Sequence, residues 1–192
     1  MAPERDSDGR GLTRRALAHR GGAAAVAASS STLIGGLIAD AANAQSESFD
    51  ASISAIIGLE NTLVVVYEEA LASGKLSDES RQLANVFGRQ SAEQARLLRS
   101  LLTTTAPPRP PHASEVTGLG DVKTGRGYIE VAGNFENQAY LGYIDALDSA
   151  TEKEPILLLS QLAASTAQHL ALLREALGHL PAPSAFETGL SV

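Results

Sequence analysis

Residues 53–71 read ISAIIGLENTLVVVYEEAL, a run in which apolar residues recur every three or four positions. This spacing places them on one face of an α-helix, and one acidic residue, Glu60, stands on the same face. The three valines at 64–66 would suit a strand, but the helical period on both sides overrides them. The run therefore predicts a helix over about residues 48–73 that carries a carboxylate on its core side.

Three more stretches repeat this period, and they predict helices over about residues 77–103, 124–149 and 152–177. Local signals agree with these limits. Gly74 suits a C-cap, Ser77 suits the N-cap of the second helix, and Pro155 falls in a first turn, where its missing N–H costs little. Four helices without a strand pattern predict an all-α fold, an antiparallel four-helix bundle.

The connection between the second and third helices is unusually long. Residues 104–121 include PPRPP at 107–111, which excludes helix and favours extended chain. A stiff crossover is the expected role, and a ligand for a proline-recognition domain is the alternative. The tail from Leu180, with Pro181 and Pro183, is expected to be extended and to fold back over the bundle.

Each predicted helix carries polar residues near the middle of its apolar face. Because the midpoints of antiparallel helices share one level, we expect these side chains to meet in one buried layer. The set comprises Glu60; Gln90, Ser91 and Gln94; Glu136; and Ser165, Thr166 and His169. Burying carboxylates is costly unless they are paired or bound to a cation. The layer is therefore the candidate functional site.

The first 44 residues are typical of an export leader. A twin-arginine segment at Arg14-Arg15 precedes a weakly apolar run over about residues 21–39, and Ala42-Asn43-Ala44 gives a cleavage signal. The alternative is a disordered or membrane-anchoring N-terminus, but the run is short and rich in Ala, Ser and Gly. The prediction is a twin-arginine signal peptide at 1–44, a single domain at 45–192, an extracytoplasmic or secreted location and no stable membrane span after processing.

Charge and composition limit the classes of binding partner that the chain is expected to have. The whole chain has 15 Lys and Arg against 22 Asp and Glu, of which residues 1–44 hold 5 and 4, so residues 45–192 carry 10 against 18 and a net charge of −8. An acidic domain without a basic stripe excludes nucleic acid as the expected partner. With no cysteine in the chain, no disulfide stabilises the domain. A protein partner or a second copy of the chain remains the expectation.

Several short motifs resemble one known family. They are Leu59-Glu60-Asn61, Phe135-Glu136-Asn137 with Ala139-Tyr140-Leu141, Gln168-His169 and the closing residues 181–187, PAPSAFE. With the leader and the crossover, they resemble exported bacterial ferritin-like domain proteins, and most closely the desiccation-related group. The resemblance implies a ferritin-like bundle with a di-metal site built from two single Glu residues and two Glu-x-x-His pairs.

The resemblance also implies that this metal site is degenerate. The single Glu positions match Glu60 and Glu136, and one pair falls at Thr166 and His169, so that pair keeps its His alone. The other pair falls at Ser91 and Gln94 and keeps neither ligand. Three of the six expected ligands are absent, which disfavours a di-iron oxidase because two ions need several carboxylates.

Two functions follow from this donor set. The first is a non-catalytic ferritin-like bundle with no cofactor and a structural, binding or stress-related role, in which Gln90, Gln94, Ser91 and Thr166 hydrogen-bond the carboxylates. The alternative is a metalloprotein, for metal sequestration or an oxidoreductase. It would hold one Fe, Mn or Zn ion through Glu60, Glu136 and His169, with the same polar residues around the ligands. Under the first function no residue is catalytic.

Overall fold

The computed structural model of the chain describes residues 33–103 and 106–182, with side chains described from residue 48 onward. Four α-helices form its framework, and two short 3₁₀ helices lie in the crossover. They are α1 (Leu33–Ala72), α2 (Asp78–Arg99), η1 (Ala113–Glu115), η2 (Leu119–Asp121), α3 (Gly125–Ser149) and α4 (Lys153–Ala176). The described ranges contain no strand. The prediction of an all-α fold is confirmed.

The start of the first helix differs from the prediction. α1 begins at Leu33, about 15 residues before the expected start, and runs through the predicted cleavage signal at Ala42-Asn43-Ala44. The residues before the apolar pattern are rich in alanine and contain no proline, which favours helix. The helix therefore starts well before the apolar pattern does. The chain divides into two compact units at residues 37 and 38, and the bundle belongs to the larger unit, Ile38–Val192. The predicted leader lies mainly outside the described residues and stays a prediction.

The other helix limits follow the local cap signals. Ser77 Oγ accepts a hydrogen bond from Ser80 N at 3.1 Å at the start of α2, and Thr124 Oγ1 accepts one from Gly127 N at 3.1 Å at the start of α3. Both caps satisfy backbone donors that a helix start leaves without partners. Gly74, after α1, adopts a left-handed φ of 64°, which glycine accepts without a steric penalty.

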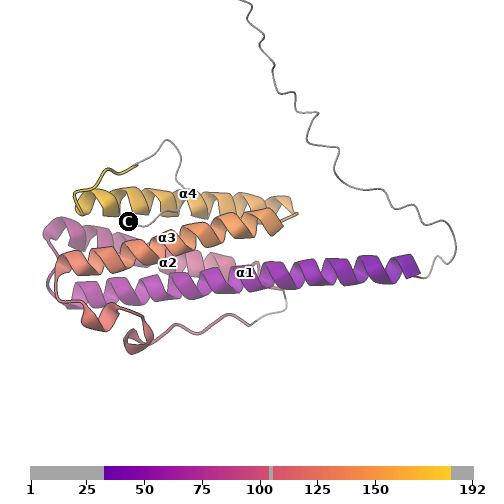
Figure 1. Ribbon diagram of the computed structural model, residues 1–192, viewed down its shortest axis with the longest axis horizontal. Helices are drawn as coiled ribbons and strands as arrows, with labels where there is room; N and C mark the ends of the chain where they lie inside the picture. Colours follow the sequence, from indigo (N-terminus) through magenta and orange to yellow (C-terminus); the bar gives the residue numbers. More distant parts are fainter. Residues whose placement is uncertain (1–32, 104–105, 183–192) are drawn as a thin grey trace, which may run out of the picture. The chain divides into compact units, whose positions relative to one another are not determined.

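Side-chain contacts fix the directions of the helices. Tyr67, late in the core part of α1, reaches Glu136 on α3, whereas Tyr143, later on α3, reaches Glu60, earlier on α1. The two helices are therefore antiparallel. α2 follows α1 through a short turn, and α4 follows α3 through another, so the bundle consists of two helical hairpins (Figure 1).

The crossover between α2 and α3 runs along the length of the bundle. It starts where Thr103 N donates to both carboxylate oxygens of Asp50 at 3.2 Å, near the first core residues of α1. It then passes Asn61, whose Nδ2 donates to Pro108 O at 3.3 Å, and it ends beside Lys75 at the opposite end of the core. Figure 1 shows this segment alongside α1. The crossover makes α2 and α3 parallel.

The apolar faces of all four helices form the core. Its largest fully buried apolar side chains are Ile53, Ile56, Ile57, Leu63, Leu98, Leu159, Leu170 and Leu173. Val86, Ile144 and Leu172 lie at the edges of the apolar faces and are exposed. Two described segments, 48–72 and 153–176, are long and apolar enough to cross a membrane by length and composition alone. Both segments also carry core side chains, and an ordinary core helix can have the same length and composition.

Candidate functional site

The structure brings the predicted polar residues together at the middle of the bundle. Glu60, Glu136, Ser91 and Thr166 are fully buried, and His169 and Gln94 are 2% and 5% exposed. Two members differ from the prediction of a fully buried set. Ser165 is half-buried and Gln90 is exposed at the outer edge of α2. Six polar side chains from four helices therefore form a buried layer. We call these six residues, together with Gln90 and Ser165 at their edge, the polar layer.

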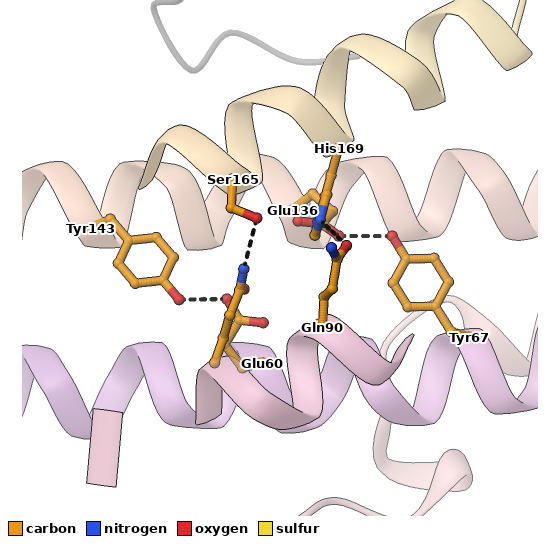
Figure 2. A network of polar contacts seen from close by, with 8 residues as sticks. Glu60, Tyr67, Gln90, Glu136, Tyr143, Ser165 and His169 are labelled. Atoms are coloured by element: carbon orange, nitrogen blue, oxygen red, sulfur yellow. Dashed lines mark hydrogen bonds and ion pairs between the residues drawn. The ribbon is translucent and has the colours of Figure 1, made fainter. Parts of the chain in front are cut away.

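Glu60 lies on α1 and is held by a tyrosine from α3. The hydroxyl of Tyr143 donates to Glu60 Oε1 at 2.7 Å (Figure 2). Burial and the nearby carboxylate of Glu136 raise the pKa of Glu60 from 4.5 to about 8, while Tyr143 and the neighbouring Ser91 oppose that shift. No hydrogen bond of ordinary geometry joins Ser91 Oγ to the carboxyl group. Glu60 is therefore mainly protonated at neutral pH, which removes one negative charge from the polar layer.

Gln94 on α2 also contacts Glu60. In one orientation of the Gln94 amide, Nε2 lies 3.2 Å from Ser165 Oγ and Oε1 faces the carboxyl oxygens of Glu60. When Glu60 is ionised, exchanging the amide oxygen and nitrogen satisfies every group. Nε2 then donates to the two oxygens of Glu60 at 2.9 and 3.1 Å, and Oε1 accepts from Ser165 Oγ at 3.2 Å. The orientation of an amide follows its hydrogen-bond network. The exchanged orientation therefore belongs to ionised Glu60, and the first orientation, in which Gln94 Oε1 can accept the O–H of protonated Glu60, belongs to the form that prevails at neutral pH.

Glu136 on α3 is the second buried carboxylate. Its Oε1 accepts a hydrogen bond from the hydroxyl of Tyr67 at 2.8 Å and lies 3.0 Å from His169 Nδ1. Its Oε2 is buried and has no hydrogen-bond partner among the described residues, and the same is true of Thr166 Oγ1. Glu136 thus has one oxygen with two partners and one buried oxygen with none among the described residues.

His169 on α4 connects the buried layer to the surface. Its Nδ1 faces Glu136, and its Nε2 lies 2.7 Å from Oε1 of the exposed Gln90 (Figure 2). An imidazolium ring, with two N–H donors, satisfies both oxygens at once. Phe87 stacks on the ring at a centroid distance of 4.0 Å and an angle of 19°. The ring is therefore held on its face by Phe87 and at both nitrogens by oxygens.

Tyr67 and Tyr143 are buried core residues, and their role in the site was not predicted from the sequence. Burial and the adjacent carboxylates raise the pKa of both phenols, so both hydroxyls remain donors at physiological pH. A signal was present in the sequence, because each tyrosine follows a core Glu by seven residues, or two helical turns. In the folded structure, each tyrosine donates a hydrogen bond to the Glu of the other helix.

The donor set does not fit a di-metal centre. Ser91, Gln94 and Thr166 stand where three acidic or imidazole ligands would be needed. Among the described residues, no three His, Cys, Asp or Glu side chains are grouped closely enough to hold one metal ion. Both nitrogens of His169 lie at hydrogen-bond distance from oxygens. As arranged, the residues suit a hydrogen-bonded network better than a ligand shell.

Comparisons with known proteins agree with this architecture. The ferritin-like domain family matches residues 55–179, a span that contains the whole polar layer. Among solved structures, a conserved hypothetical protein, rv2844, from Mycobacterium tuberculosis is similar, with a TM-score of 0.57 and 14% sequence identity. The match covers 74% of this chain and 99% of that one. At this identity the likeness concerns the fold alone. No curated protein matches the chain.

Proposed function

Because this chain belongs to the ferritin-like domain family, we propose that it is a bundle in which a hydrogen-bonded polar layer has replaced the di-metal chemistry. Its role is then non-catalytic, as an exported structural or binding protein whose partner is another protein or a second copy of itself. The family site needs carboxylates free to bind metal ions. Here the two matching carboxylates, Glu60 and Glu136, each accept a tyrosine hydroxyl instead.

The reciprocal tyrosine–carboxylate pairing carries this proposal. Hydrogen bonds from Tyr67 and Tyr143 give each buried carboxyl group a partner, which offsets part of the cost of its burial. Protonation of Glu60 leaves Glu136 as the remaining carboxylate next to His169. The layer then needs one positive charge, which the imidazolium form of His169 beside Glu136 supplies, to be neutral overall without a metal ion.

One observation favours a second candidate, a metalloprotein with a single Fe, Mn or Zn ion. Glu136 Oε2 and Thr166 Oγ1 are buried without hydrogen-bond partners among the described residues, and such atoms call for an explanation such as a bound water or ion. Glu60, Glu136 and His169 would be the ligands. His169 would then have to exchange a hydrogen bond for a coordinate bond.

Metal analysis separates the two candidates. Protein purified from its native host, without chelators, should contain no stoichiometric Fe, Mn or Zn by elemental mass spectrometry, before or after incubation with each metal. The triple variant Ser91→Glu/Gln94→His/Thr166→Glu rebuilds the family's donor set and is the positive control, provided circular dichroism shows that it folds. About one metal ion per wild-type chain, lost in His169→Ala, would overturn the proposal in favour of the metalloprotein.

Export needs its own test. The twin-arginine segment at Arg14-Arg15 motivates it, because this pair precedes an apolar run and a cleavage signal. In the native host, the wild-type chain should be recovered outside the cytoplasm with an N-terminus near Gln45. Replacing both arginines by lysine should retain the uncut chain in the cytoplasm. Equal export of both chains would show that this segment is not a twin-arginine signal.

A further inference from the structure

The two helical hairpins of the bundle repeat each other in sequence position. Glu60 and Glu136 are 76 positions apart, and so are Tyr67 and Tyr143. Each tyrosine donates to the glutamate of the other hairpin, at 2.8 and 2.7 Å. An approximate twofold relation therefore exchanges the α1–α2 hairpin with the α3–α4 hairpin.

The second helix of each hairpin obeys the same relation. Ser91 and Gln94 on α2 correspond to Thr166 and His169 on α4 with an offset of 75 positions. The relation reaches the helix ends, because Arg99 and Arg174 are also 75 positions apart. It also extends past them: the same offset leads from Pro108 in the crossover to Pro183 in the tail.

The crossover shows how such a proline segment packs on the bundle. Asn61 Nδ2 donates to Pro108 O at 3.3 Å, and Asn61 Oδ1 accepts from Arg99 Nη2 at 3.3 Å. A Cβ atom added to Gly58 would lie 3.9 Å from Cγ of Pro108, in ordinary van der Waals contact. The proline ring therefore covers the face of α1 that carries Gly58 and Asn61.

The corresponding face of α3 borders a cavity of about 510 Å³. With the offset of 76, Gly58 and Asn61 correspond to Asn134 and Asn137, and both line it. The full lining is Thr117, Gly118, Val131, Asn134, Phe135, Asn137 and Gln138. It has three amides, one aromatic ring and no charged side chain. Such a surface suits extended proline-containing chain, because amides donate to its carbonyls and aromatic rings pack against proline rings.

The tail starts in the right place to reach this cavity. Arg126 Nη1 donates to Leu177 O at 3.0 Å, which holds the end of α4 against the start of α3. From Arg126 to Asn137, α3 rises by ~17 Å at 1.5 Å per residue. After α4 the chain turns at Gly178, whose φ is 75°, and Arg174 Nη1 then donates to Pro181 O at 3.5 Å. Arg174 corresponds to Arg99, whose Nη2 donates to Asn61 Oδ1. Pro183 follows this contact by two residues, so it is within reach of Asn137, the residue that corresponds to Asn61.

We propose that residues 183–192 dock over α3 in this cavity, with Asn137 Nδ2 donating to the main-chain carbonyl of Pro183. The tail would then be a second strap, equivalent to the crossover on α1. The inference does not depend on whether the polar layer holds a metal ion.

Cysteine cross-linking tests this docking directly, because the chain has no native cysteine. Under mild oxidation, Asn134→Cys/Pro183→Cys in the full chain should form an intramolecular disulfide. It should form about as completely as Gly58→Cys/Pro108→Cys, which joins positions that are in contact in the structure. Ala92→Cys/Pro183→Cys, which pairs the tail with an exposed position on α2, should not cross-link. Tryptic peptides identify each link by mass.

Two results would overturn the proposal. The first is no cross-link in Asn134→Cys/Pro183→Cys while the crossover control links. The second is equal cross-linking of the Ala92 pair. Hydrogen exchange provides a reading that needs no cysteine. In a chain ending at Ala182, amides of residues 131–138 should exchange at least several-fold faster than in the full chain, and unchanged exchange would count against docking.

Discussion

Replacing Glu60 by glutamine should stabilise the protein in neutral and alkaline solution and change little in mild acid. Burial and the carboxylate of Glu136 raise the pKa of Glu60 from 4.5 to about 8. Between these pH values the folded chain binds a proton that the unfolded chain has released. The stability linked to Glu60 is therefore fully present below about 4.5 and is lost as the pH rises to about 8. Glutamine is neutral throughout and still offers an oxygen to the hydroxyl of Tyr143.

The size of the effect follows from the same two values. The interval from 4.5 to about 8, at ~1.36 kcal/mol per pH unit, corresponds to a loss of ~5 kcal/mol for wild type above pH 8. At pH 7 the same reasoning gives ~3 kcal/mol in favour of Glu60→Gln. Since a domain is stable by only about 5–15 kcal/mol, the difference should be large in any unfolding experiment.

Urea unfolding followed by circular dichroism, repeated between about pH 5 and pH 9, measures this difference. The curve of Glu60→Gln should separate from that of wild type as the pH rises. Glu68→Gln removes the same charge from an exposed position of α1 and should follow wild type. Parallel curves for wild type and Glu60→Gln, or a less stable Glu60→Gln at pH 8, would refute the reasoning.

Two further substitutions test the packing around the polar layer and at the bundle end. Tyr67→Phe should lower the unfolding free energy by ~1–3 kcal/mol, because Glu136 loses a buried hydroxyl donor; urea unfolding near neutral pH checks this, and an unchanged value would contradict it. Gly125→Ala should destabilise by ~1–3 kcal/mol or more, because its Cβ would clash with the backbone oxygen of Lys75. Thermal unfolding measures that loss, with Gly120→Ala as the control because its Cβ would meet nothing within 4 Å. Equal unfolding midpoints for the two variants would contradict the prediction.

Much of the polar layer was predictable from helical spacing alone. The period fixes which face of α1 carries Glu60 and which face of α3 carries Glu136, and short turns within each hairpin bring helix midpoints to one level. The partners of these carboxylates were not predictable in the same way. Tyr143 donates across 83 sequence positions, and this pairing depends on the axial register of α1 against α3, which tertiary packing sets.

Residues at the border of an apolar stripe were the least predictable. Gln90 was expected to be buried, but it is exposed and contacts the buried layer through its amide oxygen. Val86 and Leu172 also lie at the border of an apolar stripe and are 39% and 42% exposed. A stripe spans a wide arc of the helix surface, so periodicity does not show where the neighbouring helix stops covering it. The start of α1 at Leu33 escaped prediction because helical propensity continues beyond the apolar pattern.

Tyr67 pairs with Glu136, and Tyr143 pairs with Glu60. Each helical hairpin therefore supplies the hydrogen-bond partners of the buried polar groups of the other. A polypeptide containing the α1–α2 hairpin alone would keep its glutamate and its tyrosine but lose both of their partners. We therefore expect the separated halves to be unstructured in isolation and to regain helix when mixed, so that the fold is acquired in one cooperative step.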